Sequence, residues 1–259
     1  MNKGHYTKLV KRLEMISALP SVALDKIGQF SIDRRDYSMF LIRVGEPGPQ
    51  KANVMIAAGI HGDEPAGVEA ALRFVETNAS NKSLLSRFHF MVFPCNNPTG
   101  WEKGTRENWQ GIDLNREFGS RRPAPEVDII QRALSGNCFE LVFEMHEDVD
   151  SPGLYLYEIT EESSHHVAET ILHIANSMGC PINRSRYIEG MTASEGLIRR
   201  RTLRFRKTHV PQAIYTYRTC GGHVITLEPP ASVLSFEDRV KIQLTALRIT
   251  LDATRMREV

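Results

Sequence analysis

The sequence lacks several features that would assign it directly to a class of protein. Its 32 basic residues nearly balance its 31 acidic ones, so charge provides no reason to expect binding to nucleic acid or to a membrane surface. It contains no apolar run of about 18 residues, which argues against a membrane span. The first twenty residues have no continuous apolar core, so they predict an amphipathic helix and not a secretion signal.

Cysteine is also scarce. The four cysteines lie far apart and form no CxxC pair: Cys95, Cys138, Cys180 and Cys220. This spacing argues against a disulfide framework and against a structural zinc site built from thiolates. Internal repeats and low-complexity segments are absent as well. A reduced, cytoplasmic enzyme is therefore expected, and the sequence gives no oligomeric state.

Apolar residues make up 41% of the chain, enough for a sizeable core, and strand-like runs alternate with helical ones. Strands are predicted at 26–32, 37–44, 52–58, 88–94, 139–145 and 223–229. Helices are predicted at 6–18, 64–77, 126–134, 161–178 and 236–256. The segment 184–218 is expected to be a long loop. The alternation predicts a single α/β domain over residues 1–259, with a mostly parallel sheet covered by helices on both faces.

Ligands of such sheets collect beyond the carboxyl ends of the strands. The stretch "GIHGDEPAG" follows the buried run "NVMIAA" and places His61 three residues before Glu64. On a tight turn that enters a helix, these two side chains face the same way, so one ion could contact both. Gly59 and Gly62 permit the backbone bends of that turn. Alone, the pair is weak evidence and is more simply explained by an ordinary polar helix start.

A catalytic zinc site needs a third protein ligand and an open position. His146 ends the apolar strand in "VFEMHED", where the backbone holds a side chain rigidly. Alternation along that strand points Glu144 to the same side as His146, so Glu144 is the better candidate for orienting the imidazole. The surrounding carboxylates also permit a solvated acidic turn or a second metal, and one metal is expected.

Two further segments carry candidate functional groups. The long polar connection from Asn97 to Gly119 contains Arg106, Asn115 and Arg116, which suit the binding of a carboxylate. Glu228 stands at the end of a predicted strand and is followed by two prolines. A carboxylate held in this way suits a general base.

The order of these motifs resembles the zinc carboxypeptidases of the carboxypeptidase A superfamily, peptidase family M14. The resemblance includes HxxE, then NPxG with "DLNREF", then a histidine and a late glutamate, and it covers about residues 52–229. It implies an eight-stranded mixed, mostly parallel sheet flanked by helices. Compact bacterial members that cut murein peptides are the more similar subgroup. The aspartoacylase and succinylglutamate desuccinylase enzymes are relatives that share several of the motifs.

The resemblance also implies a role for each residue. His61, Glu64 and His146 would bind Zn²⁺. Glu228 would deprotonate the zinc-bound water and then protonate the leaving amine, while Arg106 would polarise the scissile carbonyl. Asn115 and Arg116 would bind the terminal carboxylate of the substrate. The tyrosine that digestive members carry before the late glutamate cannot be assigned to Tyr215 or Tyr217.

The expected function is a zinc-dependent metallocarboxypeptidase that cleaves the C-terminal amide bond of a small peptide. Two alternatives stay open: a deacylase of N-acyl amino acids with the same ligands, and a catalytically silent binding protein. The basic stretch "RRRTLRFRK" at 199–207 predicts either a solvated face or a pocket that favours acidic substrates.

Overall fold

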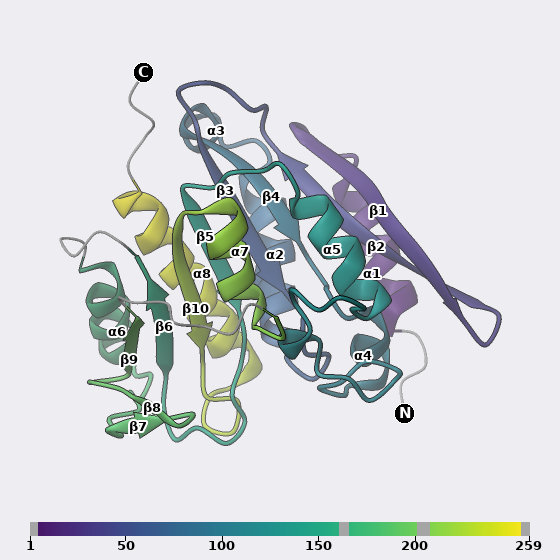
Figure 1. The fold of residues 1–259 in the computed structure, drawn as a ribbon. Coiled ribbons are helices and arrows are strands. Elements are labelled where there is room, and N and C mark those ends of the chain that lie inside the picture. Colours follow the sequence, from purple (N-terminus) through teal and green to yellow (C-terminus); the bar gives the residue numbers. More distant parts are fainter. Residues whose placement is uncertain (1–4, 161–165, 201–207, 255–259) are drawn as a thin grey trace.

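The computed structural model describes residues 5–160, 166–200 and 208–254. Its centre is an eight-stranded sheet in the order β1-β2-β4-β3-β5-β10-β6-β9 (Figure 1). The strands are β1 Val22–Ile32, β2 Arg35–Val44, β3 Ala52–Ala58, β4 Phe88–Phe93, β5 Leu141–Met145, β6 Tyr155–Ile159, β9 Leu197–Arg200 and β10 His223–Glu228. A separate two-stranded hairpin consists of β7 Tyr187–Ile188 and β8 Met191–Thr192.

The sheet is mixed, with a parallel centre. Strand β3 pairs in parallel with β4 and β5, and β5 pairs in parallel with β10. Antiparallel pairs join β1 to β2, β2 to β4 and β6 to β10. The predicted α/β class with a mixed, mostly parallel sheet is therefore confirmed.

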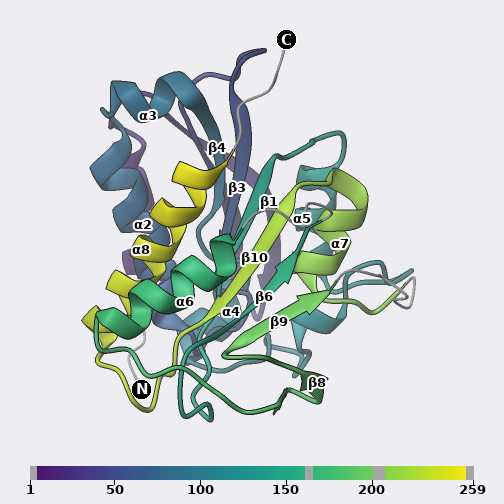
Figure 2. The same ribbon diagram turned by 90° about the vertical axis from the view of Figure 1, so that its left-hand side faces the viewer.

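Helices cover both faces of the sheet (Figure 2). They are α1 His5–Ile16, α2 Pro65–Asn78, α3 Lys82–Arg87, α4 Pro98–Lys103, α5 Pro125–Leu134, α6 Val167–Ser177, α7 Gln212–Cys220 and α8 Phe236–Ala253. One apolar cluster joins α1, α2, α6 and α8 to the sheet, and a second joins α5 and α7 to the opposite face. Central strands β3, β4 and β5 are buried along their whole length, because both of their faces are covered.

The hairpin at 26–44 and most of the predicted elements are confirmed, with small shifts at their ends. The turn of the hairpin consists of Asp33 and Arg34, both at positive φ, which is the geometry that joins two twisted antiparallel strands. The helix predicted at 161–178 begins at Val167, and residues 161–165 lie outside the described part of the chain.

The prediction of a long loop at 184–218 was wrong. This segment contributes β7, β8, β9 and most of α7. The sequence interpretation also missed β6, whose apolar and aromatic run is short and lies between turns. Strands β6 and β9 depend on tertiary pairing, since β6 pairs with β10 and β9 pairs with β6 at the edge of the sheet.

Within the described ranges, no helix combines the length and the apolar character needed to cross a membrane. The four cysteines are free thiols, as expected from their spacing.

Candidate metal centre and its pocket

The carboxyl ends of three neighbouring parallel strands meet at one edge of the sheet. Ala58 at the end of β3 pairs with Met145 of β5, and Met145 pairs with Leu227 of β10. His61 follows β3 by three residues and His146 follows β5 directly. Sheet register, and not proximity in the chain, therefore brings these segments together.

The turn after β3 needs glycine at two positions, for different reasons. Gly59 adopts a φ of +63°, which glycine tolerates far better than other residues. Gly62 instead lies against the start of α4, where an added Cβ would come within 1.9 Å of the Gly100 carbonyl carbon. The Gly62 amide donates to the Thr105 carbonyl at 2.9 Å. The turn is thus fixed against the loop that carries Arg106.

The side chains of His61, Glu64 and His146 converge, and one donor atom of each lies within 4.8 Å of the others. His61 Nδ1 lies 2.5 Å from Glu64 Oε1, and His146 Nδ1 lies 3.0 Å from Glu64 Oε2. All three residues are buried, with exposed fractions of 3–5%. Among the described residues this is the one cluster of three or more potential ligands that could hold a metal ion.

The donor set fits a divalent cation. Glu64 Oε2 and His146 Nδ1 are buried atoms without a hydrogen bond of acceptable geometry, despite their short separation. Burial alone would raise the pKa of Glu64, but the imidazoles of His146 and His61 outweigh burial and lower it to about 2. A buried carboxylate with unsatisfied neighbours requires a compensating charge. Two imidazoles and one carboxylate are a ligand set that Zn²⁺ uses in catalytic sites.

The outer nitrogen of each imidazole faces a carboxylate. His61 Nε2 lies 3.3 Å from Asp113 Oδ1, and His146 Nε2 lies 3.9 Å from Glu144 Oε2. A carboxylate within hydrogen-bond reach, as Asp113 is, fixes the tautomer and the ring orientation of a metal-binding histidine. The 3.9 Å contact of Glu144 is too long for a hydrogen bond. The expectation that Glu144 lies on the His146 side agrees with this geometry.

Arg106 lies on the solvent side of the ligand cluster. Its Nη2 donates to Asp113 Oδ2 at 3.0 Å, and its Nη1 lies 3.8 Å from Glu64 Oε1. The Asn97 side chain donates to the Arg106 carbonyl, which fixes the loop to the end of β4. The Arg106 side chain is 41% exposed and lines the pocket, so it stays available to a bound molecule.

Asn115 and Arg116 border the same pocket. Asp113 begins the short 3-10 helix Leu114–Arg116 by accepting from the Asn115 amide at 2.9 Å. Asn115 Oδ1 accepts from the Gln212 amide at 2.8 Å, which leaves Nδ2 as the donor for a ligand. The Arg116 guanidinium donates to the Asn115 carbonyl and is exposed.

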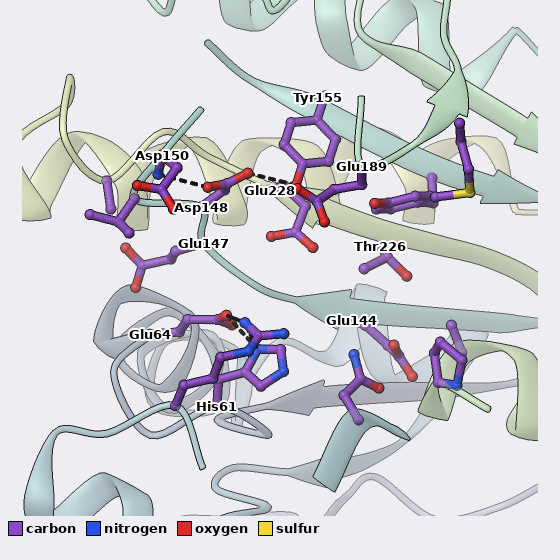
Figure 3. Close-up of a pocket in the computed structure, with 18 of the residues that line it drawn as sticks. His61, Glu64, Glu144, Glu147, Asp148, Asp150, Tyr155, Glu189, Thr226 and Glu228 are labelled. Carbon is purple, nitrogen blue, oxygen red and sulfur yellow. Dashed lines mark hydrogen bonds and ion pairs between the residues drawn. The ribbon is translucent and has the colours of Figure 1, made fainter. Parts of the chain in front are cut away.

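Glu228 ends β10 and borders the pocket opposite His61 and Glu64 (Figure 3). The pKa of Glu228 is raised to about 8, because burial disfavours its charged form and the negative charge of Glu64 adds to this effect. His146 opposes the rise but does not cancel it. The Tyr155 ring lies nearby, and its hydroxyl donates to Asp148 Oδ2 at 2.8 Å. A partly buried carboxylate with a raised pKa, beside a candidate metal centre, has the character of a catalytic acid or base.

The pocket has a volume of about 530 Å³. Six of the seven predicted site residues line it, and the seventh, His146, is buried against Glu64. The sequence interpretation missed the walls, which come from β6, from the β7–β8 hairpin and from the start of α7. Alternating residues in "LYLYEI" were the available signal for β6.

Of the basic stretch at 199–207, only the Arg199 side chain is described. Arg199 forms ion pairs with Glu158 at 2.6 Å and with Glu169 at 2.9 Å, so its charge is already compensated. Arg201, Arg204, Arg206 and Lys207 lie outside the described residues.

Zinc binding is expected to strengthen as pH rises. Burial would lower the pKa of His61 and of His146, but the negative charge of Glu64 outweighs burial and raises both. A ligand histidine must be neutral, so zinc has to displace these protons. The apparent affinity should increase by up to about tenfold per pH unit for each histidine still protonated. Competition with a chromophoric chelator between about pH 5 and 8 measures this; a flat profile would contradict the raised pKa values.

The sequence was compared with protein families and with known proteins. Residues 13–132 match the family described as zinc carboxypeptidase. The chain is 34% identical over 154 residues to carboxypeptidase E of Caenorhabditis elegans. The aligned segment covers 49% of this chain and 31% of that protein. It is 37% identical over 81 residues to murein peptide amidase A of Escherichia coli K12, which covers 30% of each chain. The matched segments thus span less than a third of either relative.

The fold is also found in solved structures. A provisionally assigned metallopeptidase of Shewanella denitrificans superposes with a TM-score of 0.79 at 19% identity, and covers 97% of this chain and 91% of its own. At this identity the likeness shows the fold alone.

Proposed function

Because this chain belongs to the zinc carboxypeptidase family, we propose that it is a zinc-dependent metallocarboxypeptidase. The reaction is hydrolysis of the C-terminal amide bond of a small peptide. One observation carries the proposal: buried donors of His61, Glu64 and His146 converge beside Glu228, in a pocket that also presents arginine and amide donors.

His61, Glu64 and His146 are the residues that hold the metal in this proposal. A bound zinc ion supplies a Lewis acid for the scissile carbonyl and lowers the pKa of water toward neutrality. Asp113 keeps the His61 imidazole in the orientation that leaves its Nδ1 atom toward Glu64.

Glu228 acts as the general base and general acid. Its carboxylate takes a proton from the attacking water and returns it to the nitrogen of the leaving amine. The pocket position places Glu228 across from the ligand cluster, so a substrate carbonyl can lie between them. The raised pKa suits this role, because a carboxyl that exchanges a proton near neutral pH is an effective donor as well as an acceptor.

Three donors orient the substrate. Arg106 Nη1 lies beside the ligand cluster, where it stabilises negative charge that develops on the carbonyl oxygen. Asn115 Nδ2 and the Arg116 guanidinium bind the free carboxylate of the residue that is released. Binding of this carboxylate restricts cleavage to the end of the chain.

A substrate panel tests the proposal and its alternative. Acylated dipeptides, murein-type peptides, N-acetylaspartate and N-succinylglutamate are incubated with protein of measured zinc content. The expected result is release of a C-terminal amino acid. A chelator should stop this release, and added zinc should restore it. Release of acetate or succinate alone would identify a deacylase instead. A zinc-loaded protein that cleaves none of these compounds would contradict the proposed function.

A further inference from the structure

Negative charge dominates the pocket. Of the described residues that line it, nine carry carboxylates and two, Arg106 and Arg116, carry guanidinium groups. The proposed metal site and catalytic base use only two of these carboxylates, Glu64 and Glu228. The partners of the individual carboxylates therefore decide which of them remain available to a substrate.

Most of the buried pocket carboxylates are already compensated within the protein. Glu147 forms an ion pair with Arg239 of α8. Glu158 forms ion pairs with Arg199 at 2.6 Å and with His223 at 2.9 Å. Glu64 belongs to the candidate metal centre.

Glu144 differs from these carboxylates. It is 2% exposed, and its Oε1 is buried without a hydrogen-bond partner. Its Oε2 has only the distant contact of 3.9 Å with His146 Nε2. The side chain borders the pocket and lies to the right of His61 and below Thr226 in Figure 3. A buried carboxylate oxygen without a partner is costly, and a cation supplied by a ligand would remove that cost.

The surroundings of Glu144 leave room for a side chain to reach it. Its neighbours in the sheet are Ala57 on β3 and Thr226 on β10, which are both small. Ala213 and Ile214 at the start of α7 form an apolar wall of the pocket. An apolar wall that leads to a buried carboxylate matches an aliphatic chain with a cationic end.

The recess adjoins the donors that bind the substrate carboxylate. Asn115 Oδ1 accepts from the amide of Gln212, the first residue of α7, so Asn115 is fixed directly to the helix that walls the recess. A residue whose carboxylate contacts Asn115 therefore has its own side chain beside α7.

We propose that Glu144 determines specificity, by recognising an amine or guanidinium at the end of the side chain of the residue that is released. This inference rests on the proposed carboxypeptidase function and names its substrate class: peptides with a basic C-terminal residue. The charge of Glu144 is the selective element, while α7 supplies contacts that any aliphatic chain can make.

The test compares acylated dipeptides that end in lysine, arginine, norleucine or glutamate. Norleucine matches most of the lysine side chain but lacks the amine. The wild-type protein is expected to prefer lysine or arginine over norleucine by roughly 10- to 100-fold in kcat/KM. Glu144→Gln should remove that preference by lowering kcat/KM for the lysine and arginine substrates alone. The kcat/KM of the norleucine substrate should change by less than about threefold. Zinc content is measured for every variant.

Glu189→Gln is the matched control, because Glu189 is an exposed carboxylate of the same pocket. It should keep the preference for basic residues. Equal losses for lysine and norleucine in Glu144→Gln would overturn the proposal and assign Glu144 to positioning His146. The proposal would also be overturned if the wild-type protein cleaved the dipeptide ending in norleucine as well as the one ending in lysine. This outcome does not depend on whether the variant folds.

Binding separates this inference from the proposed function. Calorimetry measures free L-lysine and L-norleucine as ligands of the zinc-loaded protein. Tighter binding of lysine that Glu144→Gln abolishes would support the cation site even if no peptide is cleaved. Equal binding of the two amino acids would count against the site even if peptides are cleaved.

Discussion

Replacement of His146 by alanine is expected to reduce bound zinc from about one ion per chain to nearly none. The imidazole is 3% exposed and its Nδ1 faces Glu64 Oε2 at 3.0 Å, so its removal takes one of the three converging donors out of the cluster. A site with two protein ligands is a poor zinc site, because catalytic zinc is held by three. Metal content of the purified protein after dialysis, and zinc affinity by chelator competition, measure the effect.

His173→Ala is the matched control for that substitution. His173 lies on α6, is exposed, and carries the same side chain away from the pocket. It should leave zinc content unchanged. Full zinc occupancy in His146→Ala would show that the ligand cluster is not the metal site, and the proposed function would fail with it.

Replacement of Glu228 by glutamine is expected to separate metal binding from catalysis. Glu228 is not among the converging donors, so zinc content should match that of the wild type. Glutamine cannot accept and return a proton, and loss of a general acid–base group typically lowers kcat by about 10²- to 10⁴-fold. Steady-state kinetics on the best substrate of the panel, with zinc content measured in parallel, test this expectation.

The exposed residue Glu195 provides the control for Glu228→Gln. Its side chain is 72% exposed and pairs with Arg184, outside the pocket lining. Glu195→Gln should keep wild-type turnover. A Glu228→Gln variant with near wild-type kcat and full zinc would remove Glu228 from the mechanism.

Local patterns predicted the elements that lead into the site. Strand β3 was predicted with its observed bounds, since "ANVMIAA" is a continuous apolar run that ends at a glycine. The order of HxxE, the late histidine and the late glutamate likewise indicated the family. These signals succeed because a ligand pair three residues apart and a buried strand are written in contiguous sequence.

The pocket walls could not be predicted in the same way. Strand β9 is four residues long and joins the sheet by pairing with β6, and α7 has a weak apolar face within a segment of mixed character. Their structure depends on partners far along the chain, which single-segment propensity does not register. The same holds for Arg199, which the sequence assigned to a solvated face or to a pocket for acidic substrates and which in the fold forms ion pairs with Glu158 and Glu169.

The sequence by itself predicted the α/β class, the family and the candidate ligands, because each prediction depends on residue types at short or ordered spacings. Only the tertiary structure decided which charges remain available. Glu147, Glu158 and Glu144 are all carboxylates of the same pocket, yet two are paired by distant basic residues and one has an oxygen without a partner. Pairing across a fold depends on distances in space, and those distances follow from the sheet register and from the packing of α7 and α8.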